Sequence, residues 1–167
     1  MALKKNPKGK RREAEVACEH YCLKKMDCII TRRAIKTQWQ SVDFFGSDVV
    51  GKRADGSHVY VQVTAGQSKA VNERKKKLEA FPWHKTDTVQ LLQLVQTPDP
   101  ANARRTKYFF RVYDYANIER STMPQIESIL ERQWRTREVA IDVPGEWFRS
   151  PYSKKVSAGG TDDNDKG

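Results

Sequence analysis

The sequence predicts an α/β protein in which helices flank a mixed central β-sheet. Runs of β-prone residues cover 58–64, 88–96 and 107–115, and segments with helical spacing of apolar residues lie before and between them. A turn containing Asp55 and Gly56 separates two β-rich segments, which is typical of a hairpin. The 167 residues, of which 38% are apolar, suffice for one domain with its own core.

The first helix is expected over Arg11–Met26, where small and apolar residues recur at helical spacing. Glu13 lies one turn before Ala17 and therefore at the border of the buried face of this helix. Residues 1–12 are rich in Lys and Arg, a composition that favours solvation over packing, so we expect a flexible basic arm. The folded domain is then expected to span residues 13–150.

The hairpin is the clearest local pattern. A short strand is expected over Cys28–Arg33 and a polar loop over Ala34–Ser41, and the hairpin arms follow at Val42–Arg53 and His58–Thr64. Successive side chains of a strand point to opposite faces, so the three valines of the second arm face one side and Gln62 faces the other. We therefore expect Gln62 to face a cleft and not the core.

The second half of the chain predicts two helices and two strands. A helix with a dense basic surface is expected over 67–80 and ends before a proline. Strands are expected over Thr88–Gln96 and Lys107–Tyr115, joined by a loop rich in Pro, Asn and Arg. Pro124–Arg137 has the apolar spacing of an amphipathic helix with Pro in its first turn. Residues 151–167 are polar and Gly-rich, so we expect a disordered tail.

The charge of the chain favours nucleic acid as the partner. Lysine and arginine number 31 against 21 acidic residues, a formal net charge of +10 that attracts polyanions. Such an excess can serve solubility alone, but the clustering of the cations favours a phosphate-binding surface. The residues expected to contact DNA are Lys8, Lys10, Arg11, Arg12, Arg32, Arg33, Lys69, Arg74, Lys75, Lys76 and Lys77.

Several classes of protein lose support. The chain has no apolar run of about 18 residues, which a membrane span requires, and no secretory signal, so we expect a cytoplasmic protein without a membrane partner. The three cysteines, Cys18, Cys22 and Cys28, form an odd set in one segment, which favours small buried residues over disulfides or a zinc site. Neither the Walker nor the Rossmann glycine pattern occurs, which argues against ATP and dinucleotide chemistry.

Two oxygen-bearing side chains on the hairpin indicate metal chemistry. Asp48 in the first arm and Gln62 in the second would meet on neighbouring strands once the chain folds about the Asp-Gly turn. Glu13 on the first helix is the natural third oxygen donor. A metal nuclease needs such ligands to hold Mg²⁺ against the phosphate. Taken alone, Asp48 and Gln62 are each more often structural positions, and their combination with the basic helix favours a site.

The pattern resembles the archaeal-type Holliday junction resolvases of the PD-(D/E)xK nuclease superfamily, and their phage and bacterial relatives. The shared features are the helix segment KGKRREAE, the hairpin arms SDVVG and VYVQVT, and the basic helix that follows. The resemblance implies a PD-(D/E)xK nuclease-like fold and a site in which Glu13, Asp48 and Gln62 bind Mg²⁺, for which Mn²⁺ can substitute. It also implies a homodimer that resolves four-way DNA junctions, with a phage or its bacterial host as a plausible source.

Two positions depart from the family pattern. Gln62 replaces a carboxylate, although an amide oxygen can still bind a metal. Thr64 stands where the family has lysine, and Lys69 or Lys77 on the following helix, or a second metal, could supply the missing cation. Asp43 would restore the carboxylate only if a bulge turned it toward the site.

We therefore expect a metal-dependent, structure-selective endodeoxyribonuclease with Glu13, Asp48, Gln62, Lys69 and Lys77 as its catalytic residues. Two alternatives remain at the level of sequence. One is a nuclease-fold protein that binds nucleic acid without cutting it, which the two departures favour. The other is a restriction or repair endonuclease that cuts linear duplex DNA with the same residues.

Overall fold

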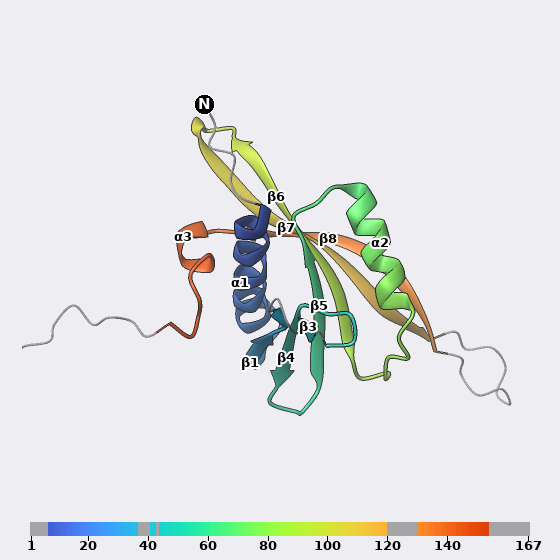
Figure 1. Cartoon of the computed structure of the whole chain (residues 1–167). Coiled ribbons are helices and arrows are strands. Elements are labelled where there is room, and N and C mark those ends of the chain that lie inside the picture. The colour runs from blue at the N-terminus through green and yellow to red at the C-terminus, as the bar shows by residue number, and fades with distance from the viewer. Residues whose placement is uncertain (1–6, 37–40, 43, 120–129, 154–167) are drawn as a thin grey trace, which may run out of the picture.

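The structure, a computed structural model, describes residues 7–36, 41–42, 44–119 and 130–153 (Figure 1). It is an α/β fold with a six-stranded mixed sheet flanked by helices, as expected, and the strands lie in the order β1, β4, β5, β6, β7, β8. No helix in this part of the chain is long and apolar enough to cross a membrane. The elements are α1 (Pro7–Lys25), β1 (Cys28–Arg33), β2 (Ile35–Lys36), β3 (Ser41–Val42), β4 (Val49–Arg53), β5 (His58–Thr64), α2 (Ser68–Glu79), β6 (Thr88–Asp99), β7 (Asn102–Glu119), β8 (Leu130–Ile141) and α3 (Pro144–Trp147).

Neighbouring strands of the large sheet are antiparallel except β5 and β6, which are parallel. Parallel strands need a crossover connection, and α2 supplies it. The expected hairpin of β4 and β5 is confirmed. In its turn Asp55 Oδ1 accepts the Ser57 N–H at 2.8 Å, and Gly56 has a φ of +87°, which glycine adopts without strain.

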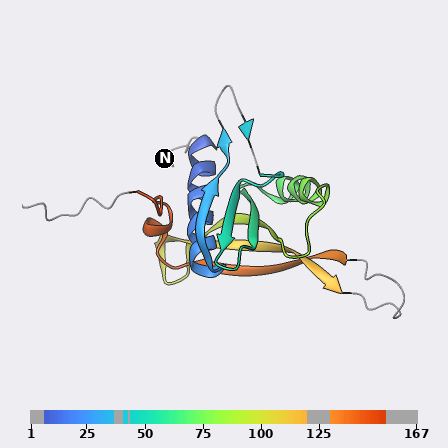
Figure 2. The same ribbon diagram turned by 90° about the horizontal axis from the view of Figure 1, so that it is seen from below.

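Helices cover both faces of the sheet, with α1 on one side and α2 on the other (Figure 2). The core on the α1 side includes Cys18 and Val61, and the smaller core on the α2 side includes Leu78 and Leu91. Side chains alternate along β5, so Gln62, which follows Val61, belongs to the α2 side. The face of the hairpin that was expected to carry the site is therefore the face that α2 covers.

Both ends of the folded region differ from the sequence expectation in their limits. Helix α1 begins at Pro7 instead of Arg11, so residues 7–12 of the expected arm are helical. Proline suits the first turn of a helix because an N–H there would lack an intrahelical partner. At the other end, residues 151–153 of the expected disordered tail are described, and the Tyr152 hydroxyl accepts the Thr31 N–H at 2.7 Å. Residues 1–6 and 154–167 lie outside the described part of the chain.

A tight turn interrupts the first arm of the hairpin. Strand β3 pairs with β2 in a separate two-stranded sheet, inside what was expected to be loop and arm. The turn at 44–47 follows, and in it Phe45 and Gly46 have φ values of +55° and +82°. Asp48 therefore lies at the exit of this turn, directly before β4. Asp43 lies outside the described residues.

The helix expected over Pro124–Arg137 is wrong for its second half. Residues 130–137 belong to strand β8, which pairs antiparallel with β7, and residues 124–129 lie outside the described chain. Trp134 stacks on Tyr115 of β7 with ring centroids 4.6 Å apart. The apolar spacing fits a helix, but pairing with β7 across the whole of β8 overrides that local preference.

The long loop expected between Gln96 and Lys107 is also wrong. Strand β6 continues to Asp99, a turn follows at Pro100 and Ala101, and β7 already begins at Asn102. The two strands pair throughout, with a register shift near the turn. Prolines are tolerated on strands that lack a partner on one edge, so they do not prevent this hairpin.

Candidate functional site

The hairpin brings Asp48 and Gln62 into direct contact. The Asp48 N–H donates to the Val61 carbonyl at 2.9 Å, which holds Asp48 beside β5. Its carboxylate Oδ2 accepts hydrogen bonds from Gln62 Nε2 at 2.8 Å and from the Val63 N–H at 3.1 Å. Both residues are buried, each with 2% of its surface exposed. The carboxylate is thus held at the edge of the β4–β5 hairpin by donors from the neighbouring strand.

Two buried side-chain oxygens beside Asp48, Ser47 Oγ and Gln62 Oε1, have no hydrogen-bond partner among the described residues. A carboxylate only accepts hydrogen bonds, so the Gln62 amide must turn Nε2 toward Asp48, which leaves Oε1 as an unsatisfied acceptor. A buried polar atom without a partner destabilises a fold by about 1–3 kcal/mol. Gln62 therefore offers an oxygen to a donor or a cation.

Helix α2 directs two cations toward the sheet. Val71 and Leu78 are its buried residues, and helical spacing puts Arg74 and Lys75 on the same stripe. Arg74 Nη1 lies 3.8 Å from Asp48 Oδ2, and the Arg74 side chain keeps 28% exposure. Sequence analysis assigned Arg74 only to DNA binding. The structure adds that its guanidinium contacts the predicted metal-binding carboxylate.

The other cations of α2 divide between the sheet and the surface. Lys75 Nζ lies 4.3 Å from the centroid of the Tyr113 ring, a cation–π contact that fixes this lysine against β7. The remaining lysines of the helix that were expected to bind DNA are exposed: Lys69, Lys76 and Lys77. Their ammonium groups are therefore accessible from outside the fold.

Glu13 belongs to the opposite layer of the fold. It is half-buried on α1, which covers the face of β5 opposite to Gln62. The C-terminal end of α1 lies by the hairpin turn, where Arg53 donates to the carbonyl of the residue after the helix. Nearer its middle, α1 contacts Arg33, which pairs with the first residue of β4. Followed from its C-terminal end back to its N-terminal end, α1 therefore runs from the hairpin turn toward the end of β4 that carries Asp48. Glu13 lies beyond Glu19 in this direction.

Arg33 has a buried acidic partner. Its Nε lies 2.8 Å from Glu19, whose side chain is 3% exposed, and the same carboxylate accepts a hydrogen bond from Thr31. This guanidinium ties β1 to α1. Arg32 and Arg12 are exposed. Three further predicted DNA contacts lie in the first turns of α1, where only the backbone is described: Lys8, Lys10 and Arg11.

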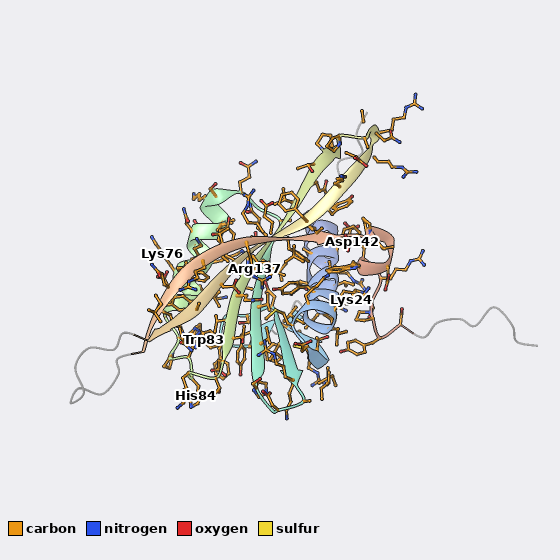
Figure 3. The ribbon with its side chains drawn as sticks, turned by 180° about the vertical axis from the view of Figure 1, so that it is seen from behind. Lys24, Lys76, Trp83, His84, Arg137 and Asp142 are labelled. Atoms are coloured by element: carbon orange, nitrogen blue, oxygen red, sulfur yellow. The ribbon has the colours of Figure 1, made fainter. Side chains whose placement is uncertain are left out.

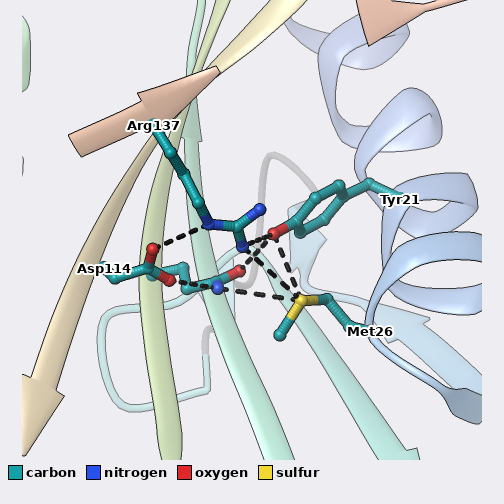
Figure 4. Close-up of polar contacts among 5 residues, drawn as sticks. Tyr21, Met26, Asp114 and Arg137 are labelled. Atoms are coloured by element: carbon teal, nitrogen blue, oxygen red, sulfur yellow. Dashed lines mark hydrogen bonds and ion pairs between the residues drawn. The ribbon is translucent and has the colours of Figure 1, made fainter. Parts of the chain in front are cut away.

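A second buried polar cluster lies between α1 and the later strands (Figure 4). The Tyr21 hydroxyl donates to Gln90 Oε1 at 3.0 Å and accepts from Arg137 at 2.6 Å. Arg137, at the middle of β8 in Figure 3, also donates to Asp114 at 2.9 Å. Burial raises the pKa of Tyr21 far above its ordinary value, so the hydroxyl keeps its proton. The members satisfy one another, and the cluster serves to fasten α1 to the sheet.

The cysteines are buried, unpaired thiols. Cys18, Cys22 and Cys28 form no disulfide, and burial raises the pKa of Cys18. A thiol with a raised pKa is a poor nucleophile and a poor metal ligand. Within the described ranges, no group of three or more His, Cys, Asp or Glu side chains is placed to hold a metal ion.

The donor set at Asp48 nevertheless fits a hard divalent cation. Mg²⁺ takes oxygen ligands and usually binds one or two carboxylates together with waters and substrate phosphates. The Asp48 carboxylate supplies the charge, and the unsatisfied Oε1 of Gln62 supplies a neutral oxygen next to it. The pair can contribute two ligands and leaves the remaining positions to other groups.

Comparison of the chain with protein-family models, with curated proteins and with solved structures finds no match.

Proposed function

We propose that this protein is a Mg²⁺-dependent DNA endonuclease that hydrolyses phosphodiester bonds in branched DNA, such as four-way junctions. The observation that carries the proposal is the buried contact of Asp48 with Gln62, whose Oε1 receives no hydrogen bond from the part of the chain that the structure describes. The resemblance to PD-(D/E)xK resolvases depends on the order helix, hairpin, basic helix. The elements α1, β4 with β5, and α2 follow one another in this order, which supports the proposal.

Asp48 and Gln62 would hold the metal, with Glu13 as the proposed third donor. A Mg²⁺ ion held there would supply Lewis-acid polarisation of the phosphate and activation of the attacking water. The contribution of Asp48 is a carboxylate whose position is fixed by two hydrogen bonds from β5. Because Asp48 and Gln62 are already in contact across the β4–β5 hairpin, these two ligands would need little reorganisation to bind a cation.

Arg74 takes the place of the missing motif lysine in this proposal. It connects the buried pair with the surface of α2, since it reaches Asp48 and is still part-exposed. A guanidinium is always charged and its planar fork matches a phosphate, so Arg74 can offset charge on the reacting group. Thr64 does not supply charge, and its hydroxyl accepts the Gly66 N–H at 2.9 Å in the loop before α2.

The DNA part of the proposal follows from charge. The chain carries a net charge of +10, and the exposed face of α2 holds Lys69, Lys76 and Lys77. Contacts to phosphates position a protein on DNA without reading its sequence, which suits recognition by shape. Two symmetric cuts in a junction require two sites, so the proposal includes a homodimer with two-fold symmetry.

A cleavage assay tests the proposal. The substrates are a labelled four-way junction and a linear duplex with the sequence of two of its arms, each with Mg²⁺ or with EDTA. We expect Mg²⁺-dependent cuts in the junction only. Asp48→Asn should bind the junction without cutting it, whereas the control Asp55→Asn, which changes an exposed aspartate in the hairpin turn, should cut normally.

The other outcomes overturn parts of the proposal. Junction binding without metal-dependent cleavage by the unaltered protein would identify a binding protein. Equal cleavage of both substrates would remove junction selectivity and favour a duplex endonuclease. Cleavage by Asp48→Asn at the normal rate would place the active site elsewhere.

A further inference from the structure

The hairpin of β6 and β7 projects beyond the rest of the sheet as a two-stranded ribbon (Figure 1). Pairing of β5 with β6 ends at Gln93, and pairing of β8 with β7 begins at Tyr108. From Gln96 to Lys107, therefore, β6 and β7 pair only with each other within the described structure. Residues 100–107 are all exposed. Isolated two-stranded ribbons are marginally stable, so this extension adds little to the stability of the fold.

The tip of the ribbon is built to present cations. Pro98 pairs with Thr106, but the next residue of β6 pairs with Asn102, so residues 103–105 form a bulge without partners on β6. Arg104 and Arg105 lie in this bulge and are exposed. Bulges commonly re-aim side chains at functional edges of a sheet.

The tip is also locally ordered. Asn102 Oδ1 accepts the Arg104 N–H at 3.1 Å, and Asp99 Oδ1 accepts the Ala101 N–H at 2.9 Å. Asp99 is largely buried and is paired with Lys107 at 3.6 Å, which leaves the two arginines as an uncompensated charge of +2. A hairpin that only connected two strands would need neither the extension nor the charged bulge.

The ribbon extends from the end of the sheet that carries the Asp48 site. Gln93, the last residue of β6 paired with β5, is opposite Thr64, and the neighbouring Val63 N–H bonds Asp48. A strand rises about 3.3 Å per residue, so the five residues from Gln93 to Pro98 carry the tip roughly 17 Å beyond this level. One turn of B-form DNA is about 34 Å long. A duplex that contacts the tip can therefore reach Asp48 within one turn.

We propose that the ribbon of residues 96–107 is a DNA-binding arm that enters the major groove of B-form DNA next to the site of cleavage. The major groove, about 12 Å wide, admits a two-stranded β-ribbon, and Arg104 and Arg105 would contact the phosphates at its edges. The proposal rests on DNA as the substrate of the proposed function. It adds a duplex-binding element outside α2, on a part of the molecule that the sequence predicted to be an irregular loop.

The test compares binding of the double variant Arg104→Ala/Arg105→Ala with that of a charge-matched control. The control is Lys25→Ala/Lys52→Ala, which removes two exposed lysines near the opposite, hairpin-turn end of the sheet. Affinity for a linear DNA duplex is measured in EDTA by fluorescence anisotropy over a range of salt concentrations. The same measurements on an RNA duplex of identical sequence test groove entry, because the A-form major groove is too narrow for side chains to read.

Loss of two phosphate contacts should lower the slope of log K against log salt concentration by about 2. Near 0.15 M salt each contact contributes a factor of about 5, so the ribbon variant should bind DNA about 30-fold more weakly. The control should bind within about twofold of the unaltered protein. Affinity for the RNA duplex should change little. Thermal unfolding followed by circular dichroism verifies that both variants are folded.

An unchanged DNA affinity and salt slope in the ribbon variant would overturn the proposal. An equal loss on DNA and RNA would also overturn it, because charge attraction alone would then explain the effect. A second variant, in which Asn-Gly replaces Pro98–Thr106, should reproduce the loss. If DNA binding depends on the ribbon but the protein does not cut DNA, only the proposed endonuclease activity is rejected. If the protein cuts DNA but binds it equally well without the ribbon arginines, only the proposed DNA-binding arm is rejected.

Discussion

Replacement of Gln62 by glutamate tests the Asp48 site directly, because Gln62→Glu changes charge at nearly constant shape. The amide Nε2 now donates to Asp48 Oδ2 at 2.8 Å, and both side chains are buried. Once ionised, the new carboxyl would lose this hydrogen bond and place two negative charges in contact. Arg74, 3.8 Å from Asp48, is a part-exposed cation and offsets only one of them.

The loss of unfolding free energy in Gln62→Glu has two sources, the lost hydrogen bond and the raised pKa of the introduced carboxyl. A hydrogen bond to a charged group contributes about 1.5–3 kcal/mol. Two carboxyls in contact do not ionise together easily, so the pKa of the introduced group rises above its ordinary value of about 4.3. A group whose pKa is raised on folding destabilises the fold as pH increases, by about 1.4 kcal/mol per unit until the folded-state pKa is passed. We expect a loss of about 1 kcal/mol at pH 5 and about 3 kcal/mol at pH 8.

Divalent cations should reverse the loss at pH 8. A ligand at about 100 times its Kd stabilises the folded state by about 2.7 kcal/mol, and a second carboxylate strengthens the site for Mg²⁺. The assay is urea unfolding followed by circular dichroism at both pH values, in Mg²⁺ or EDTA. The control is Gln93→Glu, a half-buried glutamine of β6 whose amide donates to the Gly66 carbonyl at 2.9 Å. It should lose stability without recovery in Mg²⁺.

The reasoning fails if Gln62→Glu destabilises the protein equally at both pH values. That result would mean that the introduced carboxyl does not contact Asp48. A pH-dependent loss that Mg²⁺ does not reverse would keep the contact but reject the pair as a cation site. Recovery of Gln93→Glu to the same extent would show that Mg²⁺ acts on the fold in general.

Three further predictions concern other parts of the fold. Gly51→Ala should lower the free energy of unfolding by about 1–3 kcal/mol, because a Cβ there would lie 2.5 Å from Cys28 Sγ. A second change, Cys28→Ala, should restore most of the lost stability in urea unfolding. Additive losses from the two changes would contradict this packing contact. Tyr21→Phe should cost about 1–3 kcal/mol, since Gln90 and Arg137 lose the hydroxyl, and an unchanged urea midpoint would contradict the cluster. Arg74→Gln should slow junction cleavage at least about tenfold, whereas the neighbouring Lys75→Gln should not. Equal effects of the two changes on the cleavage rate would mean that Arg74 has no specific part in cleavage.

The β4–β5 hairpin could be predicted from sequence because its determinants are local. The Asp-Gly turn and the alternation along 58–64 fix both the register and the face of each side chain. That is why the contact of Asp48 with Gln62, fourteen positions apart in the sequence, follows from the sequence alone. The turn at 44–47, with positive φ at Phe45, depends on packing that local preferences do not encode.

Strand β8 could not be predicted in the same way, because its conformation depends on pairing with β7 and not on its own local sequence. Residues 130–137 satisfy helical spacing as well as strand alternation, and the long edge of β7 decides between the two. The ribbon at 96–107 was missed for a related reason. Prolines and polar residues indicate a loop, whereas pairing across the turn makes them strand ends.

Arg74 was within reach of the sequence and was missed because the basic run was treated as one surface. The buried residues Val71 and Leu78 define the inward stripe of α2, and positions 74 and 75 fall between them at helical spacing. Cations on such a stripe must meet a carboxylate, an aromatic ring or solvent at the rim. Arg74 meets Asp48, and Lys75 meets Tyr113.

The Arg74 contact also gives a physical reason for the amide at position 62. The Arg74 guanidinium lies beside the carboxylate of Asp48, and a second buried carboxylate at position 62 would add a negative charge that needs its own partner. Gln62 keeps an oxygen at the site without adding that charge, and its amide N–H holds Asp48 in place. A cation site with one fewer negative charge would bind a divalent cation more weakly and would depend more on phosphate oxygens to complete its ligands. Metal affinity should therefore rise when DNA is bound. Calorimetric titration of Mg²⁺ into the unaltered protein, with and without a junction built with non-hydrolysable linkages, measures that coupling.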